Sequence, residues 1–134
     1  MGLQGSVVTP FFGASLAADL LFATEDMQFT LAHLKYGLHP TGALPYLLPK
    51  YIGVNKAKYY LYRGGHISSN EALSLGLINK VYSSNSFLNN CLSEIRSIIT
   101  NDVEVLKITK KLININADEI IKYFEYESKN TVLR

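Results

Sequence analysis

The stretch RGGHISSNEALSLGLINKVY, residues 63–82, carries the most specific local signals in the chain. Ser68 and Glu71 have the S-x-x-E spacing of a capping box, in which the two side chains satisfy free backbone N–H groups at a helix start. They predict a brief helix that ends at Gly76, because glycine readily adopts the left-handed conformation that closes a helix. The apolar run that follows, residues 77–82, predicts a strand.

On the N-terminal side of this stretch, we expect helices and strands to alternate. Thr9 can accept a hydrogen bond from the backbone two or three residues on, and Pro10 suits the first helical position, so a helix is predicted over about residues 10–21. Gly13 and nearby alanines keep one face of that helix small, so another backbone can approach closely. The alternation in Met27–Leu31 predicts a short strand.

Prolines and glycines limit the elements between this strand and residue 63. Three prolines lack a backbone N–H, so we expect only a short or kinked helix within residues 42–52. Asn55 can cap a second helix that runs to Arg63, and the glycine pair after Arg63 ends it.

The C-terminal side is expected to be helical throughout. Apolar residues recur at helical spacing in residues 86–100, 102–113 and 117–133. The predicted fold class is therefore α/β in the first part of the chain and all helix in the second. Because little sheet is available to cover the apolar faces of these helices, the chain is expected to associate with other copies or partners.

The composition indicates a single folded unit. The chain has 134 residues, of which 48% are hydrophobic and 18% charged, so it can form a core. A net charge of +2 does not point to nucleic acid or to a membrane surface, and no segment has the features of a signal peptide or a transmembrane helix. Cys91 is the only cysteine and cannot form an internal disulfide, so a reducing, cytoplasmic location is expected.

The charges are distributed unevenly. Residues 27–70 contain five lysines and arginines but no aspartate or glutamate. Three interpretations of this basic stretch remain open: it binds an anionic ligand, it binds an acidic partner, or it is a solvated helical face. The three histidines lack the close spacing of zinc ligands, so no metal site is predicted.

The order of these motifs resembles the C-terminal half of the crotonase family, the enoyl-CoA hydratase and isomerase superfamily. The matching features are Gly5 and Asp19 around the small-residue helix, MQFT before a loop that ends at Gly37, Pro40 with Gly53, and residues 63–82 with the helix that contains Lys110. The resemblance runs without a gap from Gly5 to about Asn114.

The resemblance implies a β-β-α spiral fold. Residues 1–82 would form the C-terminal part of the spiral core, and residues 83–134 a truncated helical trimerisation region. It implies a homotrimer or a higher oligomer, and substrates that are acyl thioesters of coenzyme A or of a carrier protein, without another cofactor. The family's other half supplies a second oxyanion donor, so the chain would be a fragment or be completed by a second polypeptide.

The chain departs from the family pattern where the chemistry takes place. The family's oxyanion donor lies in a glycine-rich helix start, and here Pro10, which has no N–H, occupies the donor position. The amides of Phe11, Phe12 and Gly13 could replace it if the register shifts by one residue. The two acidic residues of a typical hydratase map onto Gly13 and His33.

His33 is the residue that the resemblance places for proton transfer, and an imidazole can act as acid or base near neutral pH. The alternative is an ordinary polar loop histidine. Tyr36 lies three residues further on and could line the same pocket, or be a core or surface tyrosine. Phe11 and Phe12 could shape an apolar acyl pocket, or simply bury a helix end.

Two functional hypotheses follow. The first is an enzyme that processes acyl thioesters through an oxyanion-stabilised enolate, by isomerisation, decarboxylation or hydration, with two-carboxylate hydration the least favoured. The second is a catalytically silent fragment or subunit with a structural or partner-binding role.

Overall fold

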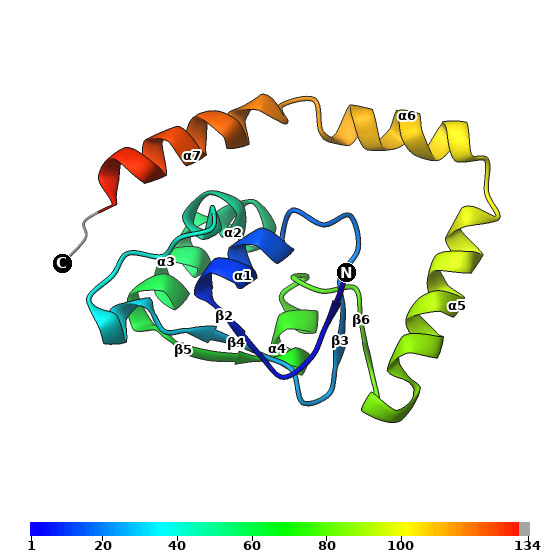
Figure 1. The fold of residues 1–134 in the computed structure, drawn as a ribbon, viewed down its shortest axis with the longest axis horizontal. Coiled ribbons are helices and arrows are strands. Elements are labelled where there is room, and N and C mark those ends of the chain that lie inside the picture. The colour runs from blue at the N-terminus through cyan, green and yellow to red at the C-terminus, as the bar shows by residue number, and fades with distance from the viewer. Residues whose placement is uncertain (132–134) are drawn as a thin grey trace.

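The computed structural model describes residues 1–131. Two small sheets and four short helices form an α/β body, and three longer helices form an arm around it (Figure 1). The strands are β1 (Gly2–Leu3), β2 (Ser6–Val8), β3 (Phe22–Thr24), β4 (Gln28–Leu31), β5 (Gly65–Ser68) and β6 (Lys80–Tyr82). The helices are α1 (Thr9–Ser15), α2 (Leu44–Ile52), α3 (Val54–Arg63), α4 (Ser69–Ser74), α5 (Phe87–Ile99), α6 (Val103–Ile113) and α7 (Asp118–Asn130), with 3-10 turns η1 (His33–Tyr36) and η2 (Ser84–Ser86).

The strands of the body form two three-stranded sheets. One sheet has the order β1-β3-β6 and is parallel throughout. The other has the order β2-β4-β5, in which β2 and β4 are parallel and β4 and β5 antiparallel. The core between them and the helices includes Phe12 of α1, whose ring stacks on Phe29 of β4 with centroids 3.8 Å apart.

The helix start predicted within residues 63–82 is confirmed, with the serine half of the capping box formed. The Ser68 hydroxyl accepts a hydrogen bond from the Glu71 amide at 3.2 Å and begins α4. Glu71 also accepts a 2.6 Å hydrogen bond from the Tyr60 hydroxyl, which ties α4 to α3. This bond, together with burial, raises the pKa of Tyr60 to about 12.

The close approach expected at the small face of the first helix is also confirmed. A Cβ atom added to Gly13 would lie 2.1 Å from the carbonyl oxygen of Gly42. In return, Gly42 adopts a φ of +72°, and a Cβ atom there would lie 2.3 Å from the Pro10 carbonyl oxygen. Because both positions are glycine, the backbone of α1 can contact the backbone of the residues before α2.

Three local predictions were wrong. Helix α1 ends at Ser15 rather than near residue 21, because β3 begins at Phe22 and the chain must turn before it. Thr9 does not cap α1, since its hydroxyl bonds instead to the backbone of residues 30 and 32. Asn55 does not cap α3, which begins at Val54 after Gly53.

The predictions for the central helices and the fourth strand are confirmed. The strand expected at Met27–Leu31 is β4, and the helix expected within residues 42–52 is α2. The final strand is shorter than expected, because only Lys80–Tyr82 pairs with β3. Strand β5, where we expected a glycine turn, pairs with β4.

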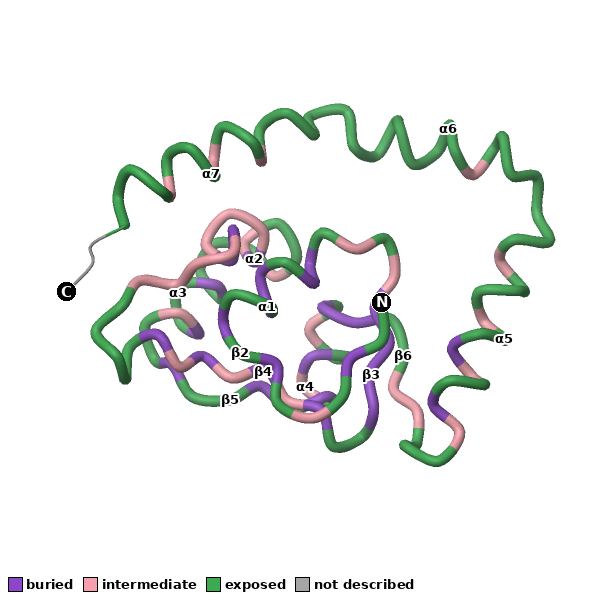
Figure 2. Tube along the Cα trace, in the orientation of Figure 1, coloured by how far each residue is buried: buried purple, intermediate pink, exposed green. Residues whose placement is uncertain are grey.

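The arm consists of the three helices predicted from apolar spacing, although the predicted end of the last helix at Leu133 lies outside the described residues. Helix α5 packs Phe87 and Cys91 against Phe22 of β3. Helix α6 is tied to the body by the ion pair of Lys110 and Asp19 at 2.5 Å. Figure 2 shows that exposed residues make up most of α6 and α7.

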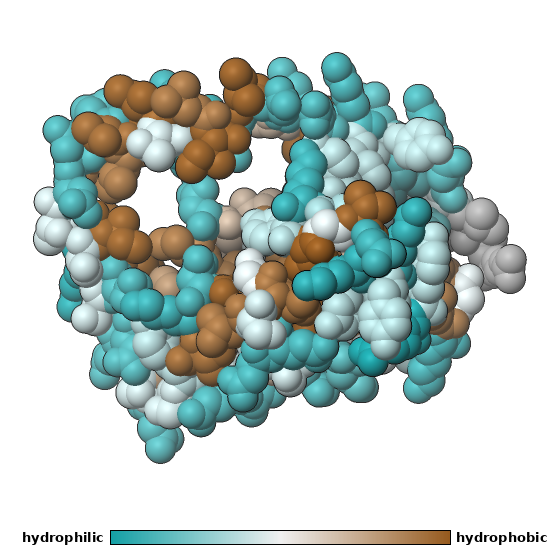
Figure 3. All heavy atoms as spheres, turned by 180° about the vertical axis from the view of Figure 1, so that it is seen from behind, coloured by the Kyte–Doolittle hydropathy of each residue, from teal (hydrophilic) through white to brown (hydrophobic). Residues whose placement is uncertain are grey.

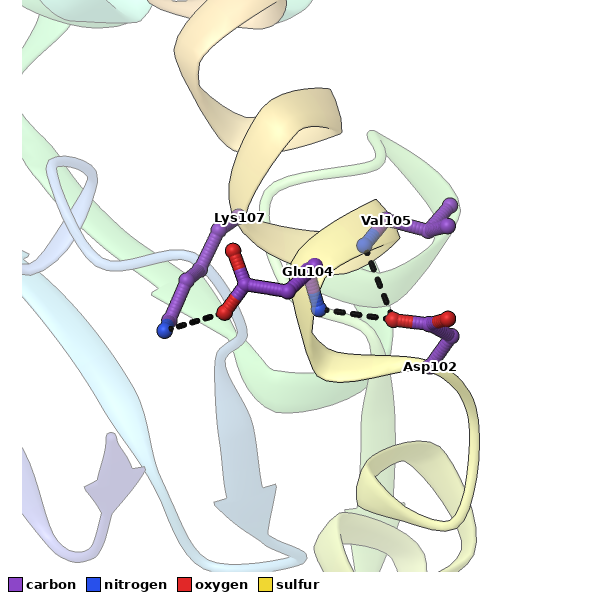
Figure 4. A network of polar contacts seen from close by, with 4 residues as sticks. All are labelled: Asp102, Glu104, Val105 and Lys107. Carbon is purple, nitrogen blue, oxygen red and sulfur yellow. Dashed lines mark hydrogen bonds and ion pairs between the residues drawn. The ribbon is translucent and has the colours of Figure 1, made fainter.

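Helix α6 begins with a well-formed cap (Figure 4). Asp102 accepts hydrogen bonds from the amides of Glu104 and Val105 at 2.9 and 3.3 Å. Lys107 donates to Glu104 at 2.8 Å one turn further along. Such a cap stabilises a helix by about 1 kcal/mol.

The arm leaves large apolar side chains exposed, as its helical spacing predicted. Leu112, Ile113 and Ile115 are 70%, 75% and 80% exposed. Seen from behind, hydrophobic residues gather along the arm and open gaps separate parts of it from the body (Figure 3). None of the helices within residues 1–131 has the length and hydropathy needed to cross a membrane.

Candidate functional site

The candidate site lies where two neighbouring parallel strands end. Strand β2 pairs with β4 in parallel, with Val8 opposite Thr30, so their carboxyl ends meet at the same edge. Helix α1 begins directly after β2, and the turn η1 begins two residues after β4. In open α/β sheets, this edge is the usual place for a ligand.

Thr9 connects the two chain segments at this edge. Its hydroxyl donates to the carbonyl oxygen of Thr30 at 3.2 Å and accepts from the amide of Ala32 at 3.2 Å. The first residue of α1 is therefore fixed next to the residue that precedes His33. The oxyanion candidate and the acid–base candidate, which are distant in sequence, come from adjoining backbone segments.

His33 is buried, with 4% of its surface exposed. Its Nε2 atom lies 2.9 Å from the carbonyl oxygen of Leu61 in α3. Because a carbonyl only accepts, Nε2 must carry the hydrogen, and Nδ1 of the neutral ring is left with a lone pair. Within the described residues, Nδ1 has no hydrogen-bond partner, although it is buried.

A cavity of about 440 Å³ adjoins this histidine. Its wall is mostly apolar and is built by η1, the segment before α2, α2 and α3. The residues that line it are His33, Leu34, Leu38, His39, Pro40, Pro45, Pro49, Val54, Ala57, Lys58, Leu61 and Tyr62. An imidazole that lines an apolar cavity and keeps one ring nitrogen unpaired suits proton transfer to or from a carbon atom of a bound substrate.

The three candidates at the start of α1 lie in different environments. The Phe11 side chain is 71% exposed, whereas Phe12 is fully buried against Phe29. Gly13 is buried against Gly42. In an α-helix each amide points to the carbonyl four residues back, so the amides of Phe12 and Gly13 are directed at Val8 and Thr9, within the helix and its cap. The Phe11 amide is the one of the three that the helix itself does not use.

Tyr36 lies on the outside of η1. Its side chain is 66% exposed, and Lys35 lies 5.8 Å from its ring centroid. It is not among the residues that line the cavity. Its assignment to substrate binding remains a prediction, as do those of His33, Phe11, Phe12 and Gly13.

Several site residues were not found from the sequence. Lys58, Leu61 and Tyr62 reach the cavity because α3 packs beside η1, and this packing has no local sequence signal. The three prolines of residues 40–49 also line the cavity, although they were interpreted only as limits on a helix. Within residues 1–131, no three His, Cys, Asp or Glu side chains are grouped so as to hold a metal ion.

Helix α7 covers a second hollow beside this cavity. The hollow has a volume of about 530 Å³ and shares Leu34, Leu38 and His39 with the first. Tyr123 of α7 stacks on Tyr46 of α2, and burial raises the pKa of Tyr123 to about 12. Glu119 accepts a 2.7 Å bond from the Tyr46 hydroxyl, which lowers the pKa of that carboxyl.

Comparison with known proteins finds a matching family model and related sequences. A family model described as enoyl-CoA hydratase/isomerase matches residues 3–132. The chain is 28% identical over 112 residues to a probable peroxisomal enoyl-CoA hydratase of Arabidopsis thaliana, covering 84% of this chain and 42% of that protein. It is 24% identical over 131 residues to a 4-chlorobenzoyl coenzyme A dehalogenase of Arthrobacter, covering 97% of this chain and 48% of that protein.

Solved structures agree with the sequence comparisons. A putative enoyl-CoA hydratase/isomerase from Acinetobacter baumannii superposes with a TM-score of 0.85 and 26% identity. The match covers 96% of this chain and 56% of that one. The chain thus spans about half the length of these relatives.

Proposed function

This chain belongs to the enoyl-CoA hydratase/isomerase family, with the crotonase fold that its sequence resembles, and we propose that it forms part of an enzyme acting on acyl thioesters. The observation that carries this proposal is the His33 side chain, whose buried Nδ1 atom has no partner among the described residues and which lines an apolar cavity. The reaction passes through an enolate, which forms at the carbon next to the thioester carbonyl.

His33 is the proton-transferring group in this proposal. As a base, Nδ1 takes a proton from the substrate carbon, and the ring becomes an imidazolium. The Leu61 carbonyl, which already accepts from Nε2 at 2.9 Å, stabilises that cation and fixes which nitrogen reacts. The proton then returns to a carbon of the substrate, either the same one or another.

The oxyanion is held at the start of α1. The Phe11 amide donates to the thioester oxygen, since the helix leaves it free and the helix dipole favours negative charge there. A fixed donor of this kind stabilises charge that develops in the transition state. The second donor comes from the rest of the fold, either from a longer form of this chain or from a second polypeptide.

With His33 as the single acid–base group, isomerisation and decarboxylation are favoured over hydration. Isomerisation requires a base that returns the proton elsewhere, and decarboxylation requires only an acid that protonates the enolate. Hydration with two carboxylates is disfavoured, because Gly13 has no side chain and His33 replaces the other acid. No metal or redox cofactor takes part in either favoured reaction.

We further propose that residues 83–134 pack against other copies in a homotrimer, since these helices leave large apolar side chains exposed. Native mass spectrometry of the complete protein counts the copies and detects a second chain.

Buried, unpaired Cys91 fits a reducing compartment such as the cytoplasm, and its burial raises the pKa of its thiol.

The function is tested by product analysis. The complete protein is incubated with three coenzyme A thioesters: an α,β-unsaturated one, a β,γ-unsaturated one and a β-carboxyl one. We expect isomerisation of the second or loss of CO₂ from the third, detected by mass spectrometry and absorbance, and little hydration of the first. Recovery of all three unchanged would favour the catalytically silent subunit, for which the loss of the N–H at Pro10 is the supporting observation.

A further inference from the structure

One surface of the body combines positive charge with exposed aromatic rings. It is the outer face of α3, here called the α3 face, formed by Lys56, Lys58, Tyr59, Tyr62 and Arg63. All five residues are exposed, Tyr59 by 59% and Tyr62 by 75%. In Figure 1, α3 lies at the opposite end of the body from α5, so this part of the arm does not cover it.

Among residues 1–131, the cations of the α3 face have no ion-pair partner. The ion pairs found across residues 1–131 use Lys50, Lys80, Lys107 and Lys110 instead. The contacts of the Arg63 guanidinium are with the rings of Tyr59 and Tyr60, at 5.3 and 5.6 Å from their centroids. The basic stretch of residues 27–70 contains no carboxylate that could pair with them.

The α3 face borders the candidate site directly. Lys58 and Tyr62 also line the cavity that holds His33. Leu34, which lines the cavity from η1, lies close to the end of α3. A Cβ atom added at Gly64 would be 3.3 Å from its side chain. A partner bound on the α3 face would therefore sit beside the cavity.

The shape of the α3 face favours an acidic protein over a small anionic ligand such as the phosphates of coenzyme A. Sites for small molecules are concave, whereas the outside of a helix is convex. The exposed tyrosines and Arg63 of this convex face are residue types that are enriched at protein–protein interfaces. The charge requires that the partner be acidic.

We propose that the α3 face is the docking surface for an acidic carrier protein, which delivers the acyl thioester into the His33 cavity on its phosphopantetheine arm. This inference rests on the proposed function, and it adds the identity of the acyl carrier. Carboxylates of the partner face Lys56, Lys58 and Arg63, and its apolar side chains contact Tyr59 and Tyr62. Free coenzyme A binds the cavity without contacting Lys56 and Arg63, which do not line it.

The test compares two carriers of one acyl group. The complete protein is assayed with a β,γ-unsaturated butenoyl group on an acyl carrier protein of fatty-acid synthesis and on coenzyme A. The variant is Lys56→Glu with Arg63→Gln, neither of which lines the cavity; a carboxylate in the first turn of α3 agrees with the helix dipole, so folding is retained. Lys111→Glu on α6 is the control for a charge change elsewhere.

We expect the variant to lose at least about tenfold in kcat/KM for the carrier-bound substrate, because charge complementarity governs the association rate. Turnover of the coenzyme A thioester, and of both substrates by Lys111→Glu, stays at the parent level. Equal losses with both substrates would assign the face to coenzyme A phosphates and overturn the proposal. An unchanged variant would overturn it as well, while leaving the acyl-thioester function intact.

A binding measurement separates this inference from the proposed function. If neither thioester reacts, the proposed function fails, and fluorescence anisotropy of labelled holo-carrier protein then decides the docking. Binding to the parent that weakens in the Lys56→Glu, Arg63→Gln variant supports the surface. Absence of binding, or equal binding to both, overturns it.

Discussion

Replacing His33 with alanine in the complete protein is expected to lower kcat at least about a hundredfold, since a positioned acid or base contributes roughly 10²–10⁴ in rate. The residue is buried, so the alanine variant also loses packing and the bond to the Leu61 carbonyl. The sequence indicated a loop residue with little packing, and the structure changes that expectation. A lower thermal stability of His33→Ala is therefore expected too.

A second variant separates chemistry from packing. The amide of His33→Gln can still donate to the Leu61 carbonyl, but it cannot accept a proton at neutral pH. Its kcat is expected to fall as far as that of His33→Ala while its melting temperature stays closer to that of the parent. His66→Ala, at an exposed histidine of β5, is the control and should keep parent activity. Turnover by both His33 variants at the parent rate would make His33 a structural residue.

Replacing Gly13 with glutamate, the acidic residue of a typical hydratase, is expected to prevent folding. The new Cβ atom would lie 2.1 Å from the Gly42 carbonyl oxygen and 2.8 Å from the Leu44 amide nitrogen, both backbone atoms that cannot move independently. Overpacking typically costs about 1–3 kcal/mol, and burying an unpaired carboxylate adds several more. The sum approaches the whole stability of a typical domain, about 5–15 kcal/mol.

The measurement is the soluble yield and the circular dichroism of the purified variant. Ala14→Glu, at the next position of α1 where the residue is exposed, is the matched control and should fold normally. A folded Gly13→Glu protein with the parent's melting temperature would show that the contact of α1 with Gly42 is loose.

The helices of this fold were largely predictable from the sequence, whereas among the strands only β4 and part of the stretch that contains β6 were predicted. Apolar spacing over eleven or more residues located α5 to α7, and one serine with one glutamate located α4. Strands β1, β2 and β3 contain only two or three residues, too few for alternation to appear. In β3 all three residues are buried, so no polar position marks its faces.

The candidate site was predictable in part. The position of His33 followed from the resemblance, and the small face at Gly13 followed from its composition. The cavity could not be predicted, because Leu61 is 28 positions from His33 and only the packing of α3 on η1 joins them. The same packing places the lysines and tyrosines of α3 beside the cavity.

In the proposed function, the complete protein forms an enolate with His33 as the proton-transferring group. Exchange of the α-protons of butyryl-coenzyme A in D₂O, followed by mass spectrometry, tests this step, because exchange needs the enolate but no onward reaction. We expect deuterium incorporation by the parent protein and at least about a hundredfold slower incorporation by His33→Gln. No incorporation by the parent, or equal incorporation by both proteins, would contradict it.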